Sequence, residues 1–248
     1  MDALTVQGLT KRYPGFVLDN ISFRLAKGRI MGLIGKNGAG KTTTLKSILN
    51  LVNPDAGQVS MFGQEFRSNE ERCKQKIGVV LGGIDFYKHK KLAEITQVTL
   101  RFYEHWDEDA YQGYLRSFAL DPQKRVQELS SGMKVKYMIA LALSHNAQLL
   151  ILDEPTSGLD PVARDELLEL FRELVKEGDL SILYSTHITS DLEKCADDIT
   201  YISAGKLLAS AEKAEFVRSF QHLKQPGESG ELSLEEIMIR QERSMRHA

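Results

Sequence analysis

The sequence has little of what marks a secreted, metal-clustered or membrane-spanning protein. It holds two cysteines, Cys73 and Cys195, whose separation does not match metal-ligand spacing, so we expect both to be reduced and without a functional role. No stretch approaches the ~18 consecutive apolar residues that a spanning helix needs. Residues 1–4 lack the basic start and apolar run of a signal peptide. These absences predict a cytosolic chain.

The charge balance argues against nucleic acid and acidic lipid as partners. The formal net charge is −2, so no global basic field favours nucleic acid or acidic lipid, and we expect no nucleic-acid partner. With 42% hydrophobic and 27% charged residues, the composition is that of an ordinary globular protein. A length of 248 residues allows one large or two small domains with a sizeable core.

The clearest motif is the stretch Gly35–Thr42, which matches the phosphate-binding pattern G-x-x-x-x-G-K-[ST]. An apolar run of strand type precedes it, and a helical pattern follows. The backbone N–H groups of such a loop and the helix N-terminus together form a cradle for phosphate. Lys41 would reach the β- and γ-phosphates, and the Thr42 hydroxyl would sit on Mg²⁺. The predicted nucleotide-binding residues here are Gly35, Lys36, Asn37, Gly38, Ala39, Gly40, Lys41, Thr42 and Thr43.

Strand and helix patterns alternate around this loop, and they predict an α/β fold of the P-loop NTPase class. The apolar runs 77–81, 148–152 and 180–187 predict a mostly parallel sheet that helices cover on both faces. Alternation over 4–9 and 17–25 predicts N-terminal antiparallel strands, joined by a turn with Pro and Gly at its end.

Between about residues 84 and 145 the period becomes helical, which predicts an all-helical subdomain inserted into the α/β core. The basic run 88–91 opens it and is either a solvated face or a surface that docks a partner. Further along, a linker leads into a charged amphipathic helix over 232–243. We therefore expect a main domain over 1–222 and a C-terminal linker and tail helix over 223–248.

Two acids and a histidine follow predicted strands. Asp153 and Glu154 end one apolar run, and His187 ends another. The carboxyl ends of parallel strands meet at one edge of a sheet, so these residues can converge on the phosphate site. Asp153 would bind Mg²⁺, Glu154 would orient and deprotonate the attacking water, and His187 would donate to the γ-phosphate. The alternatives are acids that cap a strand end and a structural histidine.

Weaker local signals complete the candidate set. Ser130 and Gly132 precede a helix and would present a hydroxyl and a backbone N–H as a second anion site, although serine there is also a helix N-cap. Tyr13 lies in the N-terminal turn ahead of the phosphate loop. It either stacks on a nucleotide base or anchors the hairpin as a surface residue.

The order of these motifs resembles the ATP-binding cassette subunit of a membrane transporter, and the resemblance spans about residues 4–209. It includes the phosphate loop and the second nucleotide motif, in which Glu154 is the family's catalytic acid. The other matches are Leu129–Met133 at the family signature Leu-Ser-Gly-Gly-Gln, Ser157–Asp160 at the D-loop and His187 at the switch histidine. The resemblance favours adenine stacking for Tyr13 and adds Asp160 to the nucleotide-binding set.

The resemblance also implies a mechanism and partners. Two such cassettes, identical or different, close head to tail around two ATP molecules, so that each phosphate loop faces Ser130 and Gly132 of the other cassette. Hydrolysis then drives an integral membrane permease from the cytoplasmic face of the membrane. Ser131, Met133 and Lys134 in the signature resemble cassettes of bacterial exporters for antimicrobial peptides, drugs and similar amphiphiles. The chain also resembles these exporters in lacking the long C-terminal regulatory domain that many importers carry.

One position departs from the family pattern. Where the family has a glutamine that contacts Mg²⁺, this chain has Gly82, followed by Gly83. We expect a water to fill that position, with Asp85 as an alternative ligand. Two other functions compete with transport. Soluble cassettes of translation or repair usually carry two cassettes or long coils, which this chain lacks, and Glu154 argues against a module that binds ATP without turnover.

Overall fold

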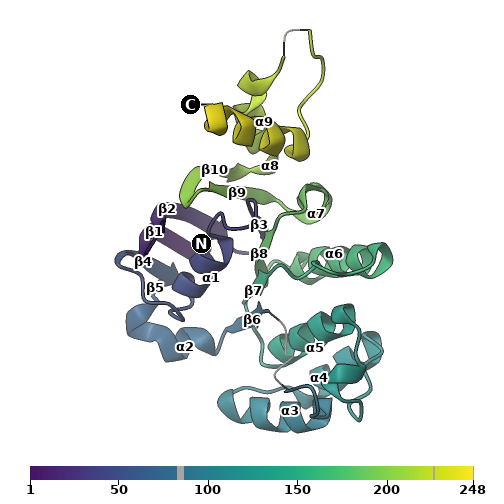
Figure 1. The fold of residues 1–248 in the computed structure, drawn as a ribbon. Helices are drawn as coiled ribbons and strands as arrows, with labels where there is room; N and C mark the ends of the chain where they lie inside the picture. Colours follow the sequence, from purple (N-terminus) through teal and green to yellow (C-terminus); the bar gives the residue numbers. More distant parts are fainter. Residues whose placement is uncertain (83–86, 226, 248) are drawn as a thin grey trace.

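The computed structural model describes residues 1–82, 87–225 and 227–247, and within them ten strands form one sheet (Figure 1). The strands lie side by side in the order β5-β4-β1-β2-β10-β9-β3-β8-β7-β6. Their bounds are β1 Asp2–Tyr13, β2 Phe16–Ala26, β3 Ile30–Ile34, β4 Ala56–Met61, β5 Gln64–Glu65, β6 Ile77–Leu81, β7 Leu149–Asp153, β8 Ser181–Thr186, β9 Asp198–Ser203 and β10 Lys206–Glu212.

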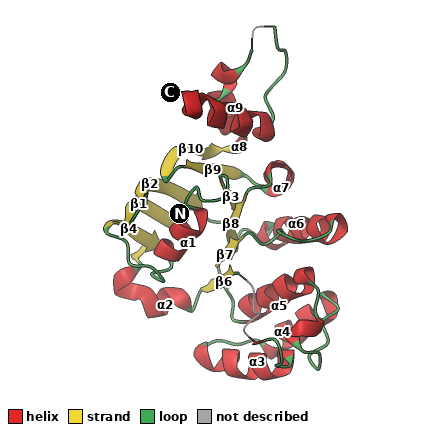
Figure 2. Ribbon diagram, in the orientation of Figure 1, coloured by secondary structure: helices red, strands yellow, loops and turns green. Residues whose placement is uncertain are grey.

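Helices connect most of these strands and cover the sheet (Figure 2). The α-helices are α1 Lys41–Ile48, α2 Glu70–Lys74, α3 Leu92–Thr99, α4 Glu108–Ser117, α5 Ser131–Ser144, α6 Pro161–Val175, α7 Thr189–Cys195, α8 Lys213–Ser219 and α9 Leu234–His247. Short 3₁₀ segments are Arg67–Asn69, Leu100–Phe102, Val126–Glu128 and Gln221–Leu223.

The sheet has an antiparallel and a parallel part, which confirms the predicted α/β fold. Strand β1 pairs antiparallel with β2 and β4, and β4 pairs antiparallel with β5. Strands β9, β3, β8, β7 and β6 are parallel neighbours in that order. The carboxyl ends of β3, β7 and β8 therefore lie at one edge of the sheet, where the loops that follow them meet.

Alternate residues of the central strands enter two different hydrophobic clusters. In β7, Leu150 and Leu152 pack in the cluster that includes the inner faces of α6 and α7. Their neighbours Leu149 and Ile151 pack in a second cluster with α1 and the N-terminal strands. Side chains along a strand point to opposite faces, so both faces of β7 are buried. This explains why the strand reads as a continuous apolar run in the sequence.

The all-helical insertion is present between β6 and β7, at the lower right of Figure 1. Helices α3, α4 and α5 share their own hydrophobic cluster, which includes Leu92, Leu115 and Leu141. Inside this cluster the Thr96 hydroxyl lies 2.6 Å from the Tyr111 hydroxyl and 2.9 Å from the Tyr137 hydroxyl. The buried hydroxyls thus satisfy one another, and burial raises the pKa of Tyr111.

Two parts of the chain differ from the sequence prediction. Strand β1 continues to Tyr13, which pairs with Phe16, so the turn consists of Pro14 and Gly15 and Tyr13 is a strand residue. The C-terminal helix α9 packs firmly against the main body, because Leu234 and Ile237 are buried in the cluster of β7 and α6. In the described part of the chain, every helix is too short or too polar to cross a bilayer.

Candidate active site

The segment Gly35–Thr42 connects the end of β3 to the start of α1. Gly40 precedes the helix with a φ of 114°, in the left-handed region that favours glycine. At Gly35 a Cβ would lie 2.3 Å from the carbonyl oxygen of Ile202, so only glycine lets the loop approach β9 this closely. The first turn of α1 leaves backbone N–H groups without helical partners, and these face an anion bound by the loop.

Lys41 is the first residue of α1, and its side chain is only 5% exposed. Its Nζ donates to the carbonyl oxygens of Gly35 at 2.7 Å and Lys36 at 3.4 Å. The same Nζ lies 3.1 Å from Oε1 of Glu154. A buried cation needs such partners to offset its lost hydration. The structure therefore holds the ammonium group of Lys41 directly against the phosphate loop.

Asp153 is the last residue of β7, and it faces Thr42 across the site. Its Oδ2 accepts a hydrogen bond from the Thr42 hydroxyl at 2.8 Å. Its Oδ1 accepts one from the Ser185 hydroxyl at 2.5 Å, because Ser185 is its register partner in β8. Two hard oxygen donors thus lie side by side, which is the donor chemistry that Mg²⁺ prefers. Sequence reasoning missed Ser185.

Glu154 follows Asp153 in a left-handed conformation with a φ of 50°. This conformation is strained for a residue with a Cβ, and hydrogen bonding from its N–H to Ser185 Oγ at 3.0 Å and Ser185 O at 3.2 Å holds it. The turn directs the carboxylate toward Lys41 and toward His187, whose Nδ1 lies 2.7 Å from Oε2 of Glu154. Glu154 thus contacts both the Lys41 ammonium and the His187 ring.

A cleft of about 600 Å³ opens over these groups. His187, which directly follows β8 and is 40% exposed, forms part of its wall. The cleft is lined by Phe16, Asn37, Gly38, Gly40, Lys41, Thr42, Thr43, Glu154, Ser157 and His187. The strand ends therefore bring the phosphate loop, one acid and the histidine to a single cavity. The sequence analysis missed Phe16, and it named Ser157 only as part of the D-loop.

Comparison with known proteins places this site in a family. The family model described as ABC transporter matches residues 18–157, more than half of the chain and both nucleotide motifs. The chain belongs to the ABC transporter family. It is the ATP-binding subunit type of that family, which binds nucleotide, couples ATP hydrolysis to transport, and generally pairs with a membrane permease and a second cassette.

Individual relatives of this ABC subunit are similar over most of its length. The bacitracin transport ATP-binding protein BcrA of Bacillus licheniformis is 36% identical, over 87% of this chain and 69% of its own. The Nod factor export ATP-binding protein I of Ralstonia nicotianae is 34% identical, over 86% and 68%. A solved structure of an ATP-binding subunit of an ABC transporter superposes with a TM-score of 0.81 at 30% identity, over 96% and 98% of the two chains.

Two aromatic residues of the N-terminal hairpin are candidates for stacking on adenine. Tyr13 is 40% exposed, and the Lys11 ammonium lies 5.6 Å from the centroid of its ring. Of the two aromatic residues that flank the turn, Phe16 is the one that lines the cleft, and its ring packs close to Gly40. Base stacking on Tyr13 stays a prediction, and Phe16 is a second candidate three residues along the same hairpin.

Alanine variants of the two rings should separate these candidates. We expect Tyr13→Ala to weaken ATP binding about tenfold or more, because stacking on a base contributes roughly 1–3 kcal/mol. Tyr13→Trp should retain affinity because indole also stacks. Titration of a fluorescent ATP analogue measures the dissociation constants. If Tyr13→Ala binds like the wild type while Phe16→Ala loses affinity, the base stacks on Phe16.

Of the signature and D-loop residues that the structure describes, only Ser157 lines this cleft. Ser130 caps α5, and its hydroxyl accepts from the N–H of Met133 at 3.2 Å. Asp160 caps α6, and its Oδ1 accepts from the N–H groups of the first turn at 3.0 and 3.1 Å. Gly132, on the first turn of α5, packs near Ala163 of α6. Within one chain, Ser130 and Gly132 therefore lie outside the cleft that the phosphate loop lines.

Gly82 follows β6 with a φ of 71°, and among the described residues beyond its chain neighbours a Cβ built there would meet no heavy atom within 4 Å. It lines a groove that also reaches Asp153, Glu154 and Ser131. The backbone thus leaves space for a side chain near the predicted metal ligand, but in a conformation that only glycine adopts easily. Asp85, the alternative ligand, lies outside the described residues.

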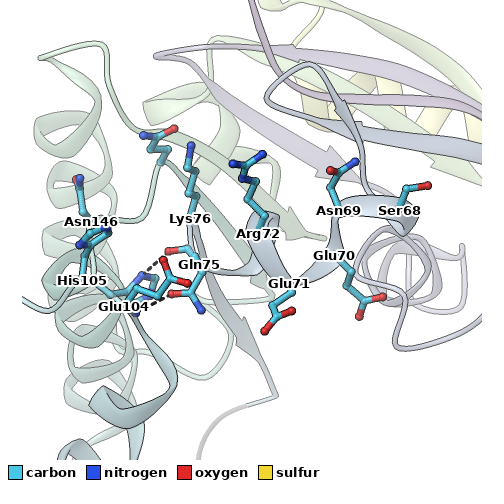
Figure 3. A pocket seen from close by; sticks show the side chains of 12 residues that line it. Ser68, Asn69, Glu70, Glu71, Arg72, Gln75, Lys76, Glu104, His105 and Asn146 are labelled. Atoms are coloured by element: carbon cyan, nitrogen blue, oxygen red, sulfur yellow. Dashed lines mark hydrogen bonds between the residues drawn. The ribbon is translucent and has the colours of Figure 1, made fainter.

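A second cleft, of about 590 Å³, lies between α2 and the helical insertion (Figure 3). There the Gln75 side chain donates to Phe102 O at 2.9 Å and accepts from the N–H of Glu104 at 3.0 Å. His145 stacks on Tyr103 with ring centroids 3.6 Å apart, and burial lowers its pKa to about 4. These groups satisfy one another, and none belongs to a nucleotide motif. We therefore assign the active site to the phosphate-loop cleft.

Proposed function

We propose that this ABC subunit closes head to tail with a second cassette around two ATP molecules and powers export through a membrane permease at the cytoplasmic face. One observation carries the head-to-tail arrangement: the chain has both a phosphate loop and a Ser130 signature, but Ser130 does not line the cleft of the phosphate loop. A second cassette would bring its own Ser130 and Gly132 to the ATP on this loop. In return, Ser130 and Gly132 of this chain would meet the ATP on the loop of the second cassette. The bacitracin-transport and Nod-factor-export relatives support peptides, drugs or other amphiphiles as cargo.

The residues of the cleft fit the hydrolysis step. Bound ATP would draw the Lys41 ammonium from the Gly35 carbonyl and Glu154 onto the β- and γ-phosphates. Glu154, released from that ion pair, would accept a proton from the water whose oxygen attacks the γ-phosphorus. His187 Nδ1 lies 2.7 Å from the other oxygen of Glu154, so the ring would orient this base before ATP binds and would donate its N–H toward the γ-phosphate once ATP is present. ADP and inorganic phosphate are the products.

A metal ion fits beside this catalytic pair. The Thr42 hydroxyl and the Asp153 carboxylate, 2.8 Å apart, are oxygen donors that would hold Mg²⁺. When bound, Mg²⁺ would neutralise charge on the phosphate oxygens. The chain's own part is to fix Asp153, which it does through the Ser185 hydroxyl.

The metal requirement tests the role of Gly82. We expect Gly82→Gln to lower the Mg²⁺ concentration for half-maximal ATPase activity, because the amide oxygen supplies the missing ligand. The left-handed backbone disfavours a side chain by roughly 1–2 kcal/mol, so Gly82→Asn, which tolerates this region better, is the companion variant. Asp85→Ala should leave the requirement unchanged. If Asp85→Ala sharply raises the Mg²⁺ requirement and neither Gly82 variant changes it, the metal ligand is Asp85.

Complementation tests whether Ser130 acts on the other cassette. We expect Lys41→Ala and Ser130→Arg chains each to lose ATPase activity, and a mixture to regain part of it. The mixed dimer holds one site with an intact Lys41 and an intact Ser130, whereas neither pure dimer does. Phosphate release at several mixing ratios measures the recovery. No recovery, with mixed dimers demonstrated by crosslinking, contradicts shared sites.

The experiment that tests the proposed function is purification of the tagged chain from membranes in mild detergent. We expect one integral membrane protein to be retained and the ATPase activity to respond to an amphiphilic peptide in reconstituted vesicles. Retention of ribosomes or DNA instead would favour the soluble-cassette alternative. Stoichiometric ATP binding without phosphate release would favour the regulatory module. Uptake rather than efflux of cargo would reverse the direction of transport.

A further inference from the structure

The C-terminal helix α9 brings a carboxylate against the phosphate loop, 206 residues away in the sequence. Oε2 of Glu242 accepts a hydrogen bond from Lys36 Nζ at 2.5 Å. Oε1 accepts from the Tyr201 hydroxyl at 3.2 Å and from the Ser203 hydroxyl, both on β9. The Glu242 side chain is 15% exposed. Both oxygens of this carboxylate are thus used, and one of them holds a residue of the loop.

Contacts of residues shortly before Glu242 in the sequence hold helix α9 against the rest of the chain. Ile237, five residues earlier, is fully buried and belongs to the same cluster as Tyr201. Arg240, two residues earlier, donates to both oxygens of Glu228 at 2.5 and 2.8 Å and to the carbonyl oxygen of Leu223 at 3.1 Å. The apolar contacts of Ile237 and the hydrogen bonds of Arg240 therefore hold α9 in place, and with it the position of Glu242.

Lys36 links this carboxylate to the loop's own geometry. Its carbonyl oxygen accepts from the N–H of Ala39 at 3.0 Å, which closes the turn of the loop, and from Lys41 Nζ at 3.4 Å. The residue before it, Gly35, lies against the Ile202 carbonyl of β9 with no room for a side chain. Fixing the Lys36 side chain therefore restrains the peptide that orients both the turn and Lys41.

The charges also fit a positioning role. Burial alone would raise the pKa of the Glu242 carboxyl, but hydrogen bonds from Lys36 and Ser203 outweigh it and hold that pKa below its usual value. An ionised carboxylate beside a phosphate site would repel the ligand if it were unpaired. Here the Lys36 ammonium neutralises it. Glu242 therefore orders the loop without opposing an anion, provided that Lys36 is present.

We propose that Glu242 is a positioning residue for nucleotide binding, and that it acts through Lys36 to set the conformation of the phosphate loop. This inference rests on the proposed phosphate-binding role of that loop. Helix α9 then contributes to ATP binding and is not merely a C-terminal extension of the domain. A purely structural role for Glu242 would instead stabilise α9 and leave nucleotide affinity unchanged.

Substitutions of Glu242 and of Lys36 should weaken ATP binding to different extents, and this difference separates a positioning role from a purely structural one. Glu242→Gln should raise the dissociation constant for ATP about three- to tenfold, the range expected for a lost hydrogen bond of ordinary strength. Lys36→Met should raise it further, because it leaves an unpaired carboxylate near the phosphates. The double variant Lys36→Met/Glu242→Gln should bind more tightly than Lys36→Met alone. Glu235→Gln, an exposed acid on the first turn of α9, is the matched control and should bind like the wild type.

Isothermal titration with ATP and thermal unfolding of the full chain measure affinity and stability side by side. Melting temperatures that fall in Glu242→Gln and Lys36→Met with unchanged affinities would overturn the positioning role. So would a double variant that binds no better than Lys36→Met. Should Glu242→Gln not fold, the exposed Lys36→Met decides the question, because an ATP affinity equal to that of the wild type would overturn the positioning role. Lys41→Ala separates the two hypotheses: if it binds ATP like the wild type, the proposed site itself is wrong.

Discussion

Glu154→Gln should bind ATP with wild-type affinity or better, lose turnover, and accumulate as a dimer in Mg-ATP. Glutamine has the shape of glutamate but cannot accept the proton of the attacking water, and a general base contributes about 10²–10⁴-fold to a rate. It also removes the Glu154 charge that holds Lys41 at 3.1 Å, which frees the ammonium for the phosphates. Closed dimers would then persist because the step that reopens them is blocked.

Light scattering with and without Mg-ATP measures the dimer, and phosphate release measures turnover. The matched control is Glu173→Gln, an exposed acid on α6 that does not line the cleft, which should behave as the wild type. The wild type can remain monomeric under the same conditions, since its closed state is short-lived. A Glu154→Gln chain that stays monomeric in Mg-ATP would contradict head-to-tail closure, and one that still turns over ATP would contradict the assignment of the base.

The convergence of the site was predictable from the sequence because it depends on periodicity and on strand ends. Asp153 and His187 each follow a buried apolar run, and parallel strands put such residues at one edge of the sheet. The Gly35–Thr42 loop has a spacing that few other structures share. Strand register was not predictable. Ser185 is opposite Asp153 only because β7 and β8 pair as they do, and a serine inside a strand carries no signal of its own.

The parts that the sequence did not reveal depend on contacts between distant segments. The amphipathic pattern of 232–243 predicted a helix there, but no local rule says that its buried face packs on β9 or that Glu242 reaches Lys36. Helices α2 and α7, with 5 and 7 residues, are too short for a helical period to show. Tyr13 was placed in the turn because Pro14 and Gly15 were taken as the end of a longer turn over 11–15 rather than as the whole turn.

A buried ion pair ties the two catalytic loops together, and breaking it should have the largest effect on stability. Asp191 of α7 is fully buried, and its Oδ1 accepts from Arg164 Nε at 2.5 Å. Its Oδ2 accepts from the Thr156 hydroxyl at 2.6 Å. Thr156 lies two residues after Glu154, and Asp191 lies four residues after His187. The pair therefore fixes the loop of the base relative to the loop of the histidine.

Arg164→Met should lower the free energy of unfolding by about 3–5 kcal/mol, because it leaves the Asp191 carboxylate buried with its hydroxyl partner but no cation. Urea unfolding followed by circular dichroism measures the difference. Asp165→Asn is the control on the neighbouring residue of α6: it breaks an exposed pair with Lys194 and should change stability little. In Arg164→Met/Asp191→Leu no charge is left unpaired, so part of the loss should return. If Arg164→Met proves as stable as the wild type, water or another group must reach Asp191, and the two loops are not held together by this pair.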